Sequence, residues 1–145
     1  MKSPILYLVF NRVDETTQSF ETIRKAKPSR LYIAADGSRK SVPGEAEICN
    51  AVSEIVTNVD WDCEVFTLFR ENNLGCRKAI IEAINWFFEN ESEGIILEDD
   101  VIPLPDFFQF CDITLETYRA NESIEAINGF HQFGQEITDN SDLFS

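Results

Sequence analysis

Mostly apolar runs and helical apolar periodicity alternate along the chain. The apolar runs predict strands over residues 5–10, 31–35, 64–69 and 94–97. Between and after them, apolar residues recur at helical spacing and predict helices over residues 14–27, 48–59, 80–88 and 105–118. We expect Asp14 to cap the first of these helices and Pro105 to open the last. A weaker run predicts a fifth strand over residues 124–128.

The regular alternation of strand and helix predicts a mostly parallel sheet joined by right-handed crossovers, with helices on both faces. The fold class is therefore α/β, a three-layer α/β/α sandwich. Ligands of such sheets bind at the carboxyl ends of the strands. The polar residues that end the apolar runs are Asn11, Arg12, Asp36, Gly37, Arg70, Glu98, Asp99 and Asp100. We expect all of them along one edge of the sheet, which makes that edge the candidate site.

Composition narrows the class of protein. The chain has 145 residues, with 26 acidic and 12 basic side chains and a formal net charge of −14. This length is typical of one domain, and a hydrophobic fraction of 43% with 12 Phe indicates a packed core. The charge argues against a nucleic-acid partner, because phosphate contacts need clustered Lys and Arg.

The spacing of the cysteines and the lengths of the apolar runs indicate in which cellular compartment the protein is expected. Cys49, Cys63, Cys76 and Cys111 lie far apart without metal-ligand spacing, so we expect reduced and mostly buried thiols. The first apolar run, residues 5–10, is much shorter than the about 20 residues of a membrane-spanning helix. We therefore expect no membrane span and a cytoplasmic protein.

The acidic triplet, Glu98, Asp99 and Asp100, is the sharpest chemical feature. Adjacent carboxylates at the end of a buried strand repel one another and resist desolvation, and a hard divalent cation relieves both effects. Strand alternation would direct Glu98 and Asp100 to one face and Asp99 to the other. The alternative interpretation is a solvated acidic loop before the next helix.

The triplet also carries a family resemblance. Residues 94–110 contain an E-D-D followed by an apolar stretch and P-D-F-F, and this segment resembles the metal-binding segment of GT-A-fold glycosyltransferases. The N-acetylglucosaminyltransferase I group is the most similar, and family 2-like enzymes share the fold. Weaker matches, in order over most of residues 4–130, are Arg12 after the first strand, Asp36-Gly37 after the second, and Asn73, Gly75, Arg77 and Lys78 before a helix.

The resemblance implies a Rossmann-like nucleotide-diphospho-sugar site. Asp100 would coordinate Mn²⁺ or Mg²⁺ bound to the diphosphate of a UDP-sugar, while Glu98 and Asp99 would hold its ribose and sugar. Other implied donor-binding residues are Arg12 beside the nucleotide, Asp36 on the uracil ring, and Arg77 or Lys78 near the diphosphate.

The implied reaction transfers a hexosyl or N-acetylhexosaminyl group to a glycan acceptor, as in bacterial glycan biosynthesis. Residues 1–145 would form the donor-binding part, with the acceptor half and the catalytic base beyond Ser145. Apolar surface left exposed on such a part would favour a homo-oligomer. His131 is interpreted as a loop residue without a chemical role, and nothing identifies Asp139 or Asp142 as a base.

Other interpretations stay open. Arg12 and Arg70 also fit strand-end charges paired with surface acids, and Asp36-Gly37 and Asn73–Gly75 also fit turns. The chain could instead be a non-catalytic nucleotide-sugar-binding or interaction module. A receiver-like phospho-acceptor domain fits less well, because the first strand would need an acidic pair at its end and the third a lone Asp, whereas here they end in Asn11-Arg12 and Arg70.

Overall fold

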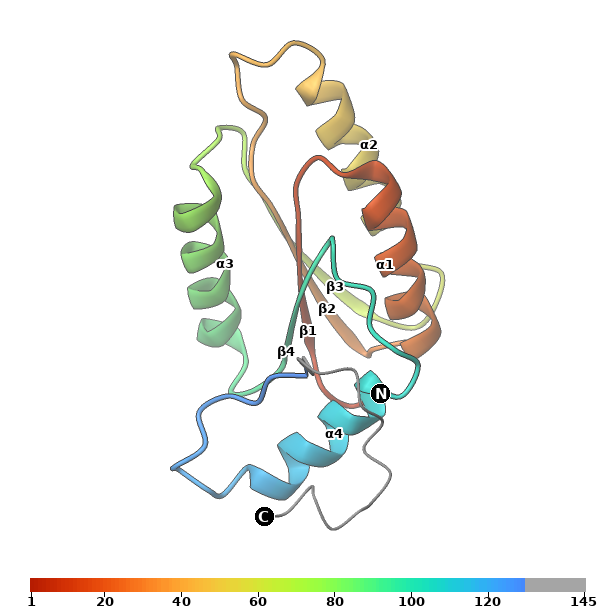
Figure 1. The fold of residues 1–145 in the computed structure, drawn as a ribbon, viewed down its shortest axis with the longest axis vertical. Coiled ribbons are helices and arrows are strands. Elements are labelled where there is room, and N and C mark those ends of the chain that lie inside the picture. The colour runs from red at the N-terminus through yellow and green to blue at the C-terminus, as the bar shows by residue number, and fades with distance from the viewer. Residues whose placement is uncertain (130–145) are drawn as a thin grey trace, which may run out of the picture.

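A computed structural model describes residues 1–129, in which strands and helices alternate (Figure 1). The elements in chain order are β1 (Ile5–Val9), α1 (Val13–Ala26), β2 (Arg30–Ala35), α2 (Glu45–Thr57), β3 (Glu64–Phe69), α3 (Cys76–Asn90), β4 (Ile95–Glu98) and α4 (Phe107–Tyr118). The predicted strands 5–10, 31–35, 64–69 and 94–97 are confirmed to within a residue at each end.

The strands form a four-stranded, all-parallel sheet in the order β3-β2-β1-β4. From β1 the chain moves outward through β2 to β3, and then returns to the other side of β1 to add β4. This order agrees with a Rossmann-like half and differs from the flavodoxin-like order 2-1-3, which receiver domains share. The direction of winding reverses between β1 and β4, which makes their boundary the topological switch point.

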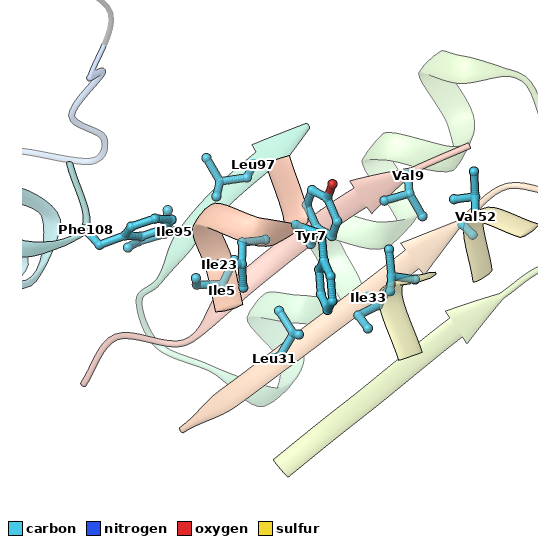
Figure 2. Close-up of a cluster of buried hydrophobic side chains, with 13 residues drawn as sticks. Ile5, Tyr7, Val9, Ile23, Leu31, Ile33, Val52, Ile95, Leu97 and Phe108 are labelled. Carbon is cyan, nitrogen blue, oxygen red and sulfur yellow. The ribbon is translucent and has the colours of Figure 1, made fainter. Parts of the chain in front are cut away.

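Both faces of the sheet are packed, as expected for a layered α/β fold. Ile5 and Tyr7 of β1 share one face with Leu31 and Ile33 of β2, and they pack against α1 and α2 (Figure 2). The intervening residues, Leu6, Tyr32 and Ala34, pack on the other face against Ala83 and Phe87 of α3. In Figure 1, α1 and α2 accordingly lie on one side of the sheet and α3 on the other.

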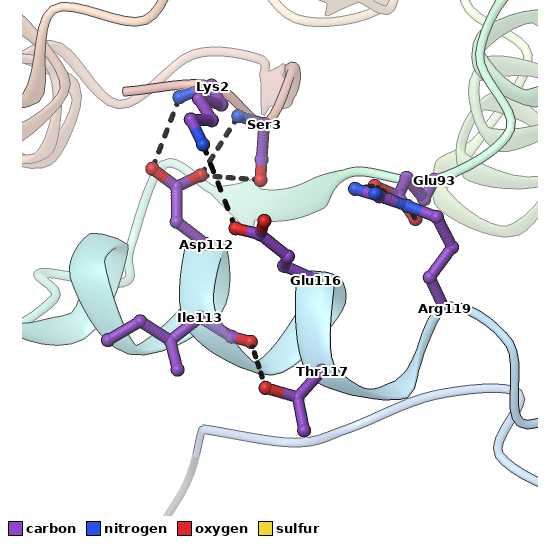
Figure 3. A network of polar contacts seen from close by, with 8 residues as sticks. All are labelled: Lys2, Ser3, Glu93, Asp112, Ile113, Glu116, Thr117 and Arg119. Carbon is purple, nitrogen blue, oxygen red and sulfur yellow. Dashed lines mark hydrogen bonds and ion pairs between the residues drawn. The ribbon is translucent and has the colours of Figure 1, made fainter.

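Helix α4 lies at the amino-terminal end of the sheet, away from the candidate edge (Figure 1). Its Asp112 accepts hydrogen bonds from the Ser3 hydroxyl, the Ser3 amide and the Lys2 amide, and Arg119 pairs with Glu93 (Figure 3). Phe108 of this helix is 7% exposed and belongs to the main hydrophobic cluster.

The structure corrects several predicted boundaries. Arg12, not Asp14, is the N-cap residue of α1, and Asp14 lies in the first turn, where a negative charge favours the helix dipole. Pro105 does not open α4, because it lies in the preceding turn and the helix begins at Phe107. Residues 124–128 form no strand. Their apolar residues do not alternate as a half-buried strand requires, and Ile127 stays 45% exposed.

The four cysteines are free, as expected, but they are less buried than predicted. Cys76 is exposed at the start of α3, and the other three are half-buried. No helix within residues 1–129 is long and apolar enough to cross a membrane.

Candidate functional site

The carboxyl ends of β1 and β4 bring Arg12 and two acids of the triplet together. Arg12 follows β1 and donates from Nη1 to Asp99 Oδ1 at 3.1 Å and to Asp100 Oδ2 at 2.5 Å. These acids follow β4, which pairs with β1 in parallel register. The predicted meeting of strand-end residues is therefore confirmed at the topological switch point. We call Arg12, Asp99 and Asp100 the switch-point cluster.

Asp99 is the buried member of this cluster, at 6% exposed. Its Oδ2 accepts the Phe10 amide at 3.2 Å, and its backbone carbonyl accepts the Ser19 hydroxyl at 3.0 Å. Burial raises the pKa of Asp99 above its usual value, although Arg12 and the Phe10 amide oppose that rise. The desolvated carboxylate is thus only partly compensated, and further positive charge nearby would stabilise it.

Asp100 and Glu98 lie differently from the prediction. The side chain of Asp100 is 47% exposed and contacts the same Arg12 nitrogen as Asp99, so these two acids do not diverge. The alternation of side chains between the two faces does not continue past Glu98, because β4 ends there. The Val101 amide donates to the Glu98 carbonyl and closes a turn. Glu98 is exposed opposite Leu8, on the α3 side of the sheet.

The side chains available as metal ligands limit which metal ion the carboxyl edge of the sheet could bind. Within residues 1–129 no group of three or more His, Cys, Asp or Glu side chains is arranged to bind a metal ion. A dedicated protein cage is therefore not formed there. Asp100, half-exposed next to Asp99, fits instead a cation that takes one or two carboxylates and completes its shell with phosphate oxygens and water, as Mg²⁺ commonly does.

Asp36 organises the loop before α3. Its oxygens accept hydrogen bonds from the amides of Leu74 and Gly75, from the Asn73 side chain and from the Gly37 amide, at 2.9–3.1 Å. A carboxylate offers about four acceptor positions, and these bonds use them. The side chain that the resemblance places on a uracil ring therefore holds protein backbone in this structure.

Arg77 and Lys78 lie in the first turn of α3 and line a shallow hollow of about 540 Å³ together with Leu74, Gly75 and Ile81. Lys78 also approaches Glu82 at 3.7 Å. This helix starts at the same carboxyl edge as the switch-point cluster (Figure 1). Within residues 1–129, neither Arg77 nor Lys78 forms a hydrogen bond or ion pair with the switch-point cluster.

A second polar group at this edge, Glu45 with Arg39 and Asn11, was not predicted from the sequence. Glu45, the first residue of α2, is 1% exposed and pairs with the Arg39 guanidinium, while its Oε1 also accepts from Asn11 Nδ2 at 2.9 Å. Arg39 also lies over the Phe10 ring, 5.6 Å from its centroid. An acid in the first turn of a helix is common, so Glu45 itself carries no distinctive signal in the sequence. Of its two partners, only Asn11 was among the predicted strand-end residues.

Other predicted positions have structural roles or fall elsewhere. Arg70 pairs with Glu82 of α3 at 3.1 Å, as the ion-pair interpretation expected. Asn73–Gly75 leads into α3, with Gly75 as the N-cap residue, but these three residues form an extended lead-in and not the turn that was the alternative interpretation. His131, Asp139 and Asp142 lie outside the described residues.

No family model and no curated protein match this chain. The functional assignment consequently depends on the fold, on the switch-point cluster and on the sequence resemblance.

Proposed function

We propose that this chain is the donor-binding part of a glycosyltransferase, holding a UDP-sugar through a divalent cation at the boundary of β1 and β4. The observation that carries the proposal is the switch-point cluster. Arg12, Asp99 and Asp100 meet where ligands of open parallel sheets bind. Residues 94–110 bear the glycosyltransferase resemblance, and two of these three residues lie in that segment.

Each member of the cluster has a distinct task in the proposed site. Asp100 is exposed enough to reach a cation, and Asp99 is buried enough to fix the position of Arg12. Arg12 would exchange its contact with Asp100 for a phosphate oxygen and keep its contact with Asp99. When bound, Mn²⁺ or Mg²⁺ supplies Lewis-acid neutralisation of the leaving diphosphate.

The remaining predicted residues take supporting tasks. Because its oxygens are occupied, Asp36 would act by positioning the Asn73–Gly75 loop and the start of α3. Arg77 and Lys78 follow that loop and would add positive charge toward the diphosphate. Such charge is needed locally, since a protein of net charge −14 repels an anionic donor.

The strand ends and the sheet order disfavour the receiver-like alternative. Asn11 and Arg12 follow β1, and Arg70 follows β3, so the acids that a phospho-acceptor site needs are absent from those described strand ends. The sheet order also differs from that of receiver domains.

The test is calorimetric titration of the chain with UDP in the presence of Mn²⁺, of Mg²⁺ and of a chelator. We expect metal-dependent binding that Asp100→Asn weakens by about tenfold or more, as loss of one charged contact would. Asp62→Asn, an exposed acid in the loop before β3, is the matched control and should bind as the parent does. Absence of UDP binding with either metal, or unchanged binding by Asp100→Asn, would contradict the proposal.

Binding and turnover are separated by a second assay. If the chain binds the donor, release of free sugar from UDP-N-acetylglucosamine and UDP-glucose distinguishes a catalytic part from a non-catalytic nucleotide-sugar-binding module. Donor hydrolysis that Asp100→Asn abolishes supports an enzyme. Metal-dependent binding without any hydrolysis or transfer favours the module.

A further inference from the structure

Strand β3 is an exposed edge of the sheet. Within residues 1–129 it pairs only with β2, and Val65, Phe66 and Phe69 are 38%, 39% and 41% exposed. Natural edge strands are commonly blunted by Pro, by Lys or by a covering segment. Residues 64–69 contain neither Pro nor Lys. Among the described residues no other strand covers this mostly apolar edge, so another strand could join it.

The hydrogen bonds to β2 determine which backbone groups face outward. The Glu64 amide donates to the Ser29 carbonyl at 2.9 Å, and the Arg70 amide donates to the Ala35 carbonyl at 3.1 Å. The N–H and C=O groups of successive residues in a strand point to alternate sides. Even-numbered residues of this strand thus bond to β2, and Val65, Thr67 and Phe69 direct their backbone groups away from the sheet.

We propose that β3 pairs with β3 of a second copy of this chain, antiparallel, with the two-fold axis at Thr67. This register opposes Thr67 to the partner's Thr67 and Val65 to the partner's Phe69. All of these are outward-facing residues, so each pair can exchange two backbone hydrogen bonds. The two four-stranded sheets become one continuous sheet of the dimer.

The side-chain pairs of this register are of the kinds that stabilise antiparallel sheets. On one face, Val65 meets the partner's Phe69 and the two Thr67 side chains meet each other. On the other face, Phe66 meets the partner's Leu68. Pairs of aromatic with β-branched residues and pairs of Thr are favourable across strands. The sequence from Glu64 to Arg70 is thus complementary to its own reverse.

Charge complementarity is the feature that specifies a second copy as the occupant. At the ends of the paired segment, Glu64 lies opposite the partner's Arg70, and the two-fold axis repeats this ion pair. Arg70 also bonds Glu82 of its own chain at 3.1 Å, but a guanidinium has enough donors for both acids. The net charge of −14 on each copy opposes the dimer, so added salt should strengthen it by screening that repulsion.

Sedimentation velocity of the full chain over a wide range of concentration tests the proposal. We expect a monomer–dimer equilibrium that Glu64→Arg or Arg70→Glu weakens by about tenfold, because each places like charges opposite one another twice. The double variant Glu64→Arg with Arg70→Glu should recover the dimer. A chain that stays monomeric at every concentration, or a double variant no better than the single ones, would overturn the proposal.

Two substitutions at Thr67, on the proposed two-fold axis, test the dimer without relying on correct folding of the charge variants. Thr67→Pro removes an outward N–H without breaking the bonds to β2, so it should abolish the dimer while thermal unfolding still reports a folded chain. Thr67→Ser retains that N–H and should remain dimeric. A dimer unaffected by Thr67→Pro would place the interface elsewhere and refute this one.

The register itself is tested by a crosslink. Residues opposed in a hydrogen-bonded antiparallel pair have Cα atoms about 5.5 Å apart, within disulfide range. Thr67→Cys should give an oxidised dimer whose peptide map shows the two copies joined through the thiols introduced at this position. Crosslinks that involve only the native cysteines would contradict the proposed axis.

Discussion

Glu45 illustrates how a single residue can fix the carboxyl edge. Its carboxylate is 1% exposed and accepts hydrogen bonds from the Arg39 guanidinium, the Arg39 amide and Asn11. The bonds from Arg39 lower the pKa of Glu45 to about 2, and burial only partly opposes them. Through these bonds Glu45 joins the end of β1, the loop after β2 and the start of α2.

Loss of the Glu45 charge should lower stability in a pH-dependent manner. A carboxyl whose pKa is depressed by folding stabilises the protein above its unfolded pKa and ceases to do so as pH falls through its folded pKa. The contribution is therefore present above pH 4.5 and is lost progressively toward about pH 2. Urea unfolding should show that Glu45→Gln is less stable than the parent at neutral pH and that the difference narrows across this interval.

Glu47→Gln is the matched control for that substitution, since Glu47 lies in the same first turn of α2 and is exposed. Its free energy of unfolding should follow that of the parent. A constant difference between Glu45→Gln and the parent from neutral pH to pH 2 would contradict the ion-pair account.

Asp36 should be important for the local order of the loop before α3. Asp36→Ala leaves the amides of Leu74 and Gly75 without their acceptor, which costs about 1–3 kcal/mol if they remain shielded from water. We expect lower stability in urea and faster hydrogen exchange at those amides. Unchanged exchange at Leu74 and Gly75 would show that Asp36 does not hold the loop.

At the scale of elements, much of the fold could be predicted because the strands are mostly apolar runs, and β1 is an uninterrupted one. Both faces of β1 and β2 are buried, and runs such as Ile5–Val9 therefore carry little polar interruption. Helix starts were harder to predict, since Arg12 caps α1 without a side-chain hydrogen bond and Asp14 is the more usual capping type.

The candidate site was predictable only where it depends on strand ends. Arg12 lies shortly after β1, and the acidic triplet begins at the last residue of β4, so a parallel sheet must bring them to one edge. The orientation of Asp100 depends on the turn after Glu98, and the burial of Glu45 depends on Arg39 folding back over it. These are tertiary contacts that spacing along the chain does not encode.

Helix α4 should be the element most sensitive to loss of one carboxylate. Asp112 joins it to the amino-terminal segment through Ser3 and Lys2 (Figure 3). Burial raises the pKa of this carboxyl, but those hydrogen bonds outweigh burial and hold the pKa below its usual value. We expect Asp112→Ala to increase hydrogen exchange throughout α4 while β1 and β2 keep their protection.

Glu116→Gln is the control on the same helix. Glu116 pairs with Lys2 at 3.7 Å, and both side chains are largely exposed, so this ion pair contributes little. Exchange in α4 should be unchanged by that substitution. Equal effects of the two variants would show that Asp112 has no special part in attaching the helix.

At the scale of the whole molecule, the excess of acids should make stability depend on ionic strength. A net charge of −14 destabilises the compact state through self-repulsion, and salt screens that repulsion. Exposed ion pairs oppose the trend only weakly. Thermal unfolding at neutral pH should therefore occur at higher temperature as sodium chloride is added, and a decrease would contradict this account.

The sheet order has a consequence for how the molecule folds. The neighbours β1 and β2 are close in sequence, as are β2 and β3, so their loops close at low entropic cost. The contact between Arg12 and Asp99 instead joins residues 87 positions apart, and it forms only when β4 docks against β1. Since contacts of long sequence separation slow folding, we infer that β4 docks last. Assembly of the switch-point cluster would then report the final, rate-limiting stage of refolding.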